Sequence, residues 1–185
     1  MNAIDALFEP YAELETAVRG LMIQLCGDTC GICTVCCCRA DICEEAIASA
    51  FLRRLLAQQG LTADHMDDRI GWLDLKGCSL EYGRPPVCYA YFCDELLARF
   101  PDDDARQAAR TLGRLMHHVG QDALDGWHLV EIKQEDDLAR VNPDPILHRL
   151  KEARSAFDAI ERFIASGHLD RSDRHCLARI TTDEP

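Results

Sequence analysis

The chain has 185 residues and a formal net charge of -12, with 48% hydrophobic and 28% charged residues. This length suits one domain with a sizeable core, and the composition is ordinary for a soluble globular protein. Because phosphate groups are bound through Lys and Arg, the acidic balance argues against nucleic-acid binding and against docking on an anionic membrane. No segment approaches the roughly 20 apolar residues of a membrane span. The acidic N-terminus is not a secretory signal, so we expect a cytoplasmic protein with reduced thiols.

The spacing of apolar residues predicts helices through the first half of the chain. We expect helices at about residues 3–25, 42–60, 62–70 and 87–100. Asp41 and Glu44 stand in capping-box spacing before the second helix, and Thr62 is a candidate cap for the third. The stretch from Gly83 to Pro86 must turn, because two prolines restrict the backbone there.

The second half of the chain is also predicted to be helical. Asp102 to Asp104 begin a helix whose C-cap is Gly120. The only plausible strand covers residues 126–132. Pro145 at a first helical position begins a long helix that ends before Gly167, and a short tail helix follows.

Two stretches of the chain are rich in cysteine. The first contains Cys26, Cys30, Cys33, Cys36, Cys37, Cys38 and Cys43, and the second contains Cys78, Cys88 and Cys93. Two-residue gaps between cysteines let a tight turn direct both sulfurs at one centre, and thiolates suit zinc or iron–sulfur clusters. Buried free cysteines or disulfides explain the whole set less well. We expect both stretches to be loops between helices, shaped by what they bind.

For some of these cysteines, roles other than binding one shared metal are open. The side chains of the contiguous Cys36, Cys37 and Cys38 diverge, so one or two of them point inward or bind a second centre. Cys43 falls in the first turn of a predicted helix, where a thiol has a lowered pKa and is reactive. We favour the alternative that Cys43 is a half-buried packing residue.

The two stretches together resemble the YkgJ-type cysteine-cluster family, whose members are described as zinc- or iron-chelating proteins. The matching residues are Cys30, Cys33, Cys36, Cys37, Cys78, Arg84, Pro85, Cys88 and Cys93. Cys26, Cys38 and Cys43 lie outside the pattern. The resemblance implies a metal site, and some relatives with this signature are thought to hold a [4Fe-4S] cluster and to support protein methylation.

We therefore predict a single compact all-α domain over residues 1–185, with a cysteine-cluster core at about 26–95 and a C-terminal helical part at about 102–180. The predicted ligands are Cys26, Cys30, Cys33, Cys36, Cys37, Cys78, Cys88 and Cys93, with Arg84 as a cofactor contact. The favoured function is a [4Fe-4S] protein in electron transfer or as part of an oxidoreductase. A zinc-thiolate interaction protein and a metal- or cluster-handling factor are the alternatives. Catalysis and the redox or protein partner stay open.

Overall fold

The computed structural model describes residues 3–30, 39–75 and 77–181. Its helices and strands are, in chain order, η1 (Ala3–Leu7), α1 (Phe8–Cys30), α2 (Ala40–Ala48), α3 (Ala50–Gln58), η2 (Ala63–His65), β1 (Leu73–Asp74), β2 (Gly77–Cys78), α4 (Val87–Ala90), α5 (Asp94–Leu97), α6 (Asp103–Gly120), η3 (Leu129–Glu131), α7 (Glu135–Leu138), α8 (Pro143–Ser166) and α9 (Arg171–Thr181). The described chain is therefore mostly helical, as its apolar periodicity predicts.

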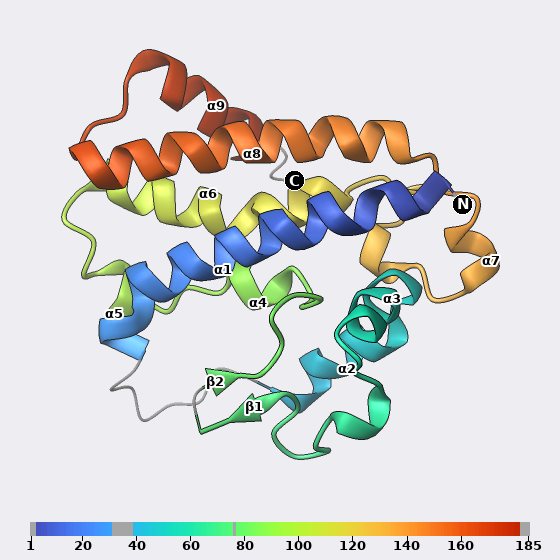
Figure 1. The fold of residues 1–185 in the computed structure, drawn as a ribbon. Coiled ribbons are helices and arrows are strands. Elements are labelled where there is room, and N and C mark those ends of the chain that lie inside the picture. Colours follow the sequence, from blue (N-terminus) through green and yellow to red (C-terminus); the bar gives the residue numbers. More distant parts are fainter. Residues whose placement is uncertain (1–2, 31–38, 76, 182–185) are drawn as a thin grey trace.

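Three long helices form the body of the molecule. α6 packs against α1 and α8, and α9 covers α6 and α8 on the far side from α1 (Figure 1). The short elements α2, α3 and the hairpin of β1 and β2 lie together on the other side of α1 (Figure 1). Buried side chains from all these regions join one hydrophobic core, whose largest members include Tyr11, Phe51, Leu80, Leu112 and Met116. Among the described helices, none has the length and apolar character to cross a membrane.

The first helix is longer than predicted. Its apolar face is buried as expected, but α1 continues to Cys30 instead of ending at residue 25. Cys26 and Thr29 are buried, so packing sustains the last turn, and no proline interrupts it. Cys26 and Cys30 are thus helical residues and not members of a loop.

The predicted second helix is two helices, divided at Ser49. The extended backbone of Ser49 breaks the helix, and its Oγ accepts a hydrogen bond from the Leu52 N–H at 3.2 Å, which caps α3. The predicted Asp41 cap is wrong, because Arg39 is the N-cap residue of α2. The Asp41 carboxylate instead accepts a hydrogen bond from Arg39 Nε at 2.9 Å. The Asp41 side chain therefore pairs with Arg39 on the exposed surface and does not cap α2.

The second cysteine stretch has more regular structure than a loop. β1 and β2 pair antiparallel, and α4 and α5 replace the single helix predicted after Pro86. Upstream, Thr62 and His65 form a capping box around the short η2, so the helix predicted to residue 70 is only one turn long. The strand predicted at 126–132 is wrong, since residues Leu129–Glu131 form η3, capped by the His128 side chain.

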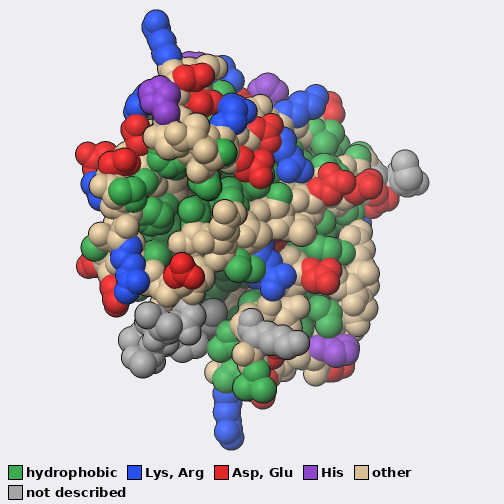
Figure 2. All heavy atoms as spheres, turned by 60° about the vertical axis from the view of Figure 1, so that its left-hand side comes forward, with side chains coloured by type: hydrophobic (Ala, Val, Ile, Leu, Met, Phe, Trp, Pro, Cys, Tyr) green, Lys and Arg blue, Asp and Glu red, His purple; other side chains and the backbone are tan. Residues whose placement is uncertain are grey.

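The C-terminal half follows the prediction more closely. Asp102 caps α6 by accepting a hydrogen bond from the Ala105 N–H at 2.8 Å, and Gly167 ends α8 in the left-handed conformation with φ of 70°. Two details are wrong. α8 begins at Pro143 and not at Pro145, and Gly120 is the last residue of α6 and not its C-cap. On the face shown in Figure 2, acidic and basic side chains are interspersed, with hydrophobic side chains between them.

Candidate metal centre

Seven of the eleven cysteines lie in the described part of the chain. They are Cys26 and Cys30 on α1, Cys43 on α2, Cys78 on β2, Cys88 on α4, Cys93 before α5, and Cys176 on α9. Four cysteines lie outside the described residues, namely Cys33, Cys36, Cys37 and Cys38. Five of the six described cysteines of the two stretches fall into two neighbourhoods.

The first neighbourhood lies where the end of α1 meets the start of α5. Cys26 and Cys30 are four residues apart, so helical geometry places them on the same side of α1. Burial, together with the neighbouring Cys30 and Cys93, raises the pKa of the Cys26 thiol to about 11. Cys93 is the N-cap residue of α5, and its sulfur accepts a hydrogen bond from the Leu96 N–H at 3.4 Å. The two cysteine stretches therefore meet at this point.

The second neighbourhood contains Cys43 and Cys78. Burial raises the pKa of the Cys43 thiol, and the charge of Cys78 adds to this, while a hydrogen bond with the Trp72 backbone opposes it. The partial burial of Cys43 and the raised pKa of its thiol favour the interpretation of a half-buried packing residue. Gly71 leaves the space that Cys43 occupies, since a Cβ on Gly71 would collide with the Cys43 sulfur.

A buried polar network fastens α1 to the turn that follows the hairpin. Glu15 on α1 accepts hydrogen bonds from the backbone N–H groups of Gly83 at 2.7 Å and Arg84 at 2.9 Å. It also accepts one from the Tyr89 hydroxyl at 2.8 Å, and that hydroxyl accepts one from Arg84 Nη1 at 3.1 Å. Glu15 is 0% exposed, Tyr89 3% and Arg84 5%. A carboxylate and a guanidinium are thus buried together, joined by one tyrosine.

Two arginines donate hydrogen bonds to Cys78. Arg84 Nε donates a hydrogen bond to Cys78 Sγ at 3.3 Å, and Arg19 Nη2 donates one to the Cys78 carbonyl oxygen at 3.0 Å. Because guanidinium groups stay charged in proteins, Arg84 places a positive charge beside the Cys78 sulfur and Arg19 places one beside the Cys78 carbonyl oxygen.

Burial and the neighbouring groups together shift the pKa values of Glu15 and Arg84. Burial raises the pKa of the Glu15 carboxyl, although hydrogen bonds from Gly83, Arg84 and Tyr89 oppose the rise. Burial disfavours the Arg84 cation, but Tyr89 and Cys78 outweigh it, and the pKa of Arg84 is raised. Within the described part of the chain, Arg84 Nη2 is buried and has no hydrogen-bond partner. Arg84 therefore keeps a donor available for a further acceptor beside Cys78.

The described residues do not by themselves complete a metal site. In residues 3–30, 39–75 and 77–181, no three Cys, His, Asp or Glu side chains come close enough together to hold an ion. Cys88 is exposed on α4. The predicted ligands Cys33, Cys36 and Cys37 lie outside the described residues, so the predicted metal centre stays a prediction.

Sequence reasoning missed two members of the polar network, Glu15 and Tyr89, and also Arg19. A signal for Glu15 was present, because it is a charged residue on the apolar face of α1, between Tyr11 and Val18. A buried carboxylate requires donors, and two of its three donors are backbone N–H groups that no side-chain pattern reveals.

Comparison with known proteins adds no relative. No family model matches the chain, and the searches of curated proteins and of solved structures find no match. The resemblance to the YkgJ-type family therefore rests on the cysteine and arginine–proline pattern alone.

Proposed function

We propose that this protein binds a [4Fe-4S] cluster and works in electron transfer or as the cluster-bearing part of an oxidoreductase. The run Cys30-x2-Cys33-x2-Cys36 has the spacing of the three-cysteine run of bacterial ferredoxins, in which a further cysteine comes from elsewhere in the chain. Such a cluster supplies one-electron transfer. Structural zinc sites usually pair two CxxC units, and the second stretch of this chain has none.

The single observation that carries the proposal is the environment of Cys78. Arg84 donates to its sulfur through Nε, and the buried Nη2 of the same guanidinium has no partner in the described part of the chain. A buried donor without an acceptor is costly. Thiolate or sulfide at this position would satisfy it, and hydrogen bonds to cluster sulfurs are a known means of setting the potential.

The proposed ligands come from both cysteine stretches. Cys30, Cys33 and either Cys36 or Cys37 would supply thiolates from the first, and Cys78, Cys88 or Cys93 would supply the further thiolate from the second. The meeting of α1 with the start of α5 at Cys26 and Cys93 supports a site shared between the stretches.

More cysteines match the family pattern than one four-ligand cluster needs. The cysteines beyond these four would either serve a second centre or exchange with the bound ligands. A chain that relies on so many thiols needs a reducing compartment, so we place the protein in the cytoplasm.

The test is a set of single substitutions to serine. Cys93→Ser and Cys78→Ser should lower the iron and sulfide bound after anaerobic reconstitution, because each removes a thiolate beside the proposed cluster. Cys176→Ser on α9 is the matched control and should keep the full content, since Cys176 belongs to neither stretch. If Cys93→Ser and Cys78→Ser both bind as much iron as the control, the proposed ligand set is wrong. Bound zinc without iron would select the zinc-thiolate alternative.

A further inference from the structure

A groove of about 490 Å³ runs along the first half of α1. Gln58, at the end of α3, and Tyr82 line its other side. α1 lies against α3 here, because the rings of Phe8 and Phe51 stack with their centroids 5.0 Å apart. The buried Phe8 and the half-buried Ala12 and Tyr82 give the groove an apolar surface.

Carboxylates edge the same groove. Asp5, Glu9 and Glu13 all line it, and they follow one another at four-residue intervals along η1 and α1, which places them on one side of the helix. Glu9 and Glu13 are exposed, and no described residue forms a hydrogen bond or an ion pair with either side chain. The groove thus combines apolar surface with two carboxylates that are open to a further cation.

At one end of this groove the chain supplies a cation of its own. The Arg54 guanidinium lies over the Phe8 ring, 5.9 Å from its centroid, and pairs with Asp5 at 3.5 Å. A planar guanidinium favours this combination of an aromatic face and a carboxylate. Further along the same groove, Tyr82 and Glu13 offer the same two kinds of group, and among the described residues no Lys or Arg pairs with that carboxylate.

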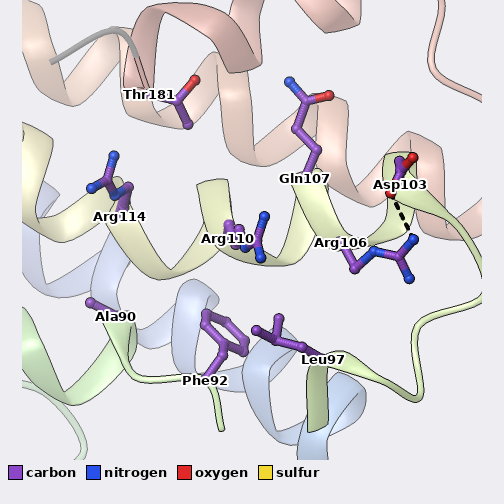
Figure 3. Close-up of a pocket in the computed structure, with 9 residues that line it drawn as sticks. All are labelled: Ala90, Phe92, Leu97, Asp103, Arg106, Gln107, Arg110, Arg114 and Thr181. Atoms are coloured by element: carbon purple, nitrogen blue, oxygen red, sulfur yellow. Dashed lines mark hydrogen bonds and ion pairs between the residues drawn. The ribbon is translucent and has the colours of Figure 1, made fainter. Parts of the chain in front are cut away.

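The larger hollow of about 630 Å³ beside α6 differs in both respects. Its carboxylate is already paired, because Arg106 and Asp103 lie 2.7 Å apart (Figure 3). Phe92, which also lines it, packs directly against α6, since a Cβ on Gly113 would lie 2.7 Å from the Phe92 ring. The groove along α1 is therefore the better candidate for a docking site.

The lining narrows the kind of cation. A divalent metal needs several ligands, and in the described ranges no three Cys, His, Asp or Glu side chains come close enough to hold one. Small organic ligands are usually mostly enclosed by their sites, whereas Glu9 and Glu13 are exposed. An arginine side chain of another protein matches both features, because its apolar stem covers apolar surface while its guanidinium pairs with carboxylates.

We propose that this groove docks a partner protein through an arginine side chain, whose stem lies on Ala12 and Tyr82 and whose guanidinium pairs with Glu9 and Glu13. The inference does not depend on the metal centre. Tyr82 precedes Gly83, whose N–H donates to Glu15 at 2.7 Å, so the docked partner would contact the turn that leads to Arg84.

The probe is a rhodamine-labelled peptide, Ala-Arg-Ala-Arg-Ala, and its control is Ala-Lys-Ala-Lys-Ala, which has the same charge. Fluorescence anisotropy at low salt should show that the full-length protein binds the arginine peptide several-fold more tightly, since the ammonium group neither stacks on a ring nor binds a carboxylate with two parallel hydrogen bonds. General attraction to an acidic chain would not distinguish the two peptides.

Variants of the protein locate the binding. Glu13→Gln should weaken the arginine peptide roughly threefold to fivefold, and Glu9→Gln combined with Glu13→Gln roughly tenfold. Glu161→Gln, an equal change of charge at an exposed position of α8 outside the groove, should alter the affinity by less than about 1.5-fold. Equal melting temperatures of these variants would show that the loss of binding is not a loss of folding.

Four results would overturn the proposal. The first three are no binding of the arginine peptide, equal binding of the two peptides, and equal affinities in Glu13→Gln and Glu161→Gln. The fourth is free arginine that binds as tightly as the peptide, which would assign the groove to a small guanidinium ligand. A dimer of the unsubstituted protein that the double variant does not form would make a second copy of the chain, and not another protein, the occupant.

Discussion

Glu15 is the residue on which the arrangement of the second cysteine stretch depends. Its carboxylate accepts hydrogen bonds from Gly83, Arg84 and Tyr89 while fully buried. In a Glu15→Gln variant, the amide N–H group would face the N–H and O–H groups that now donate to the carboxylate. The buried Arg84 would also lose its countercharge. Removing one partner of a buried charged network costs about 3 kcal/mol or more.

We therefore expect Glu15→Gln to lower the free energy of unfolding by about 3 kcal/mol, measured by urea denaturation. Glu13→Gln, an exposed change on the same helix, should alter it by no more than about 0.5 kcal/mol. If the two variants unfold at the same urea concentration, the network does not stabilise the fold.

His128 predicts how stability changes with pH. Burial, with help from nearby His117 and Arg149, lowers its pKa from 6.5 to about 4, although a hydrogen bond to the His117 carbonyl oxygen and the Glu131 charge oppose this. The unfolded chain therefore binds a proton at His128 at higher pH than the folded protein does. The contribution of the neutral, buried His128 to the free energy of unfolding is complete above pH 6.5. It is lost as the pH falls toward about 4, a change of about 3 kcal/mol.

The measurement is the free energy of unfolding between pH 6.5 and about 4. His128→Gln should show a shallower loss of stability over this range than the unsubstituted protein, while His175→Gln, at an exposed position of α9, should keep the original slope. An unchanged slope in His128→Gln would show that the folded protein protonates His128 as readily as the unfolded chain.

Between elements, Gly113 sets the distance of α6 from the second cysteine stretch. A Cβ at this position would lie 2.5 Å from the Tyr89 carbonyl oxygen and 2.7 Å from the Phe92 ring. Gly113→Ala should therefore push the segment between α4 and α5 away, at a net cost of about 1–3 kcal/mol despite the better helix propensity of alanine.

The effect should be visible as faster amide hydrogen exchange in residues 88–92 and as a lower melting temperature. Gly20→Ala is the matched control, because nothing lies within 4 Å of its added Cβ, and it should raise stability by roughly 0.5–1 kcal/mol. Similar behaviour of the two variants would contradict the close approach at Gly113.

The end of a helix could be predicted from the sequence where nearby residues determine it. The caps at Asp102 and Gly167 were readable because a single residue type determines each one. The break at Ser49 was not, since it depends on a hydrogen bond from Ala50 N–H to the distant Ile132 carbonyl oxygen at 2.8 Å. Gly120 was misread for the same reason, because it makes room for the His128 ring and does not end a helix by its own conformation.

The candidate site also combines residues that local sequence spacing suggests with residues that only the fold brings together. The cysteines were predicted as ligands from their spacing, and Arg84 was predicted as a cofactor contact from the arginine–proline pair of the family pattern. Glu15 and Arg19 lie more than fifty residues from the groups they bind, and only the packing of α1 against the hairpin and its following turn brings them there. Sequence spacing therefore yields the predicted ligands, whereas the residues that surround Cys78 could be recognised only from the fold.

Removing the metal should destabilise the whole protein. Because a shared centre would join ligands from both cysteine stretches, the proposed metal is expected to stabilise the fold by several kcal/mol. An anaerobically prepared apo form should melt at a lower temperature and exchange amide hydrogens faster at the end of α1, near Cys26. Equal melting and equal exchange in the apo and metal-loaded forms would contradict this expectation.

The most direct test is the absorption spectrum of protein isolated without oxygen, combined with its metal and sulfide content. We predict a brown protein with a broad band near about 400 nm that bleaches with dithionite, and about four iron and four sulfide per cluster. A colourless protein that holds stoichiometric zinc and is unchanged by anaerobic reconstitution with iron and sulfide would contradict the [4Fe-4S] assignment.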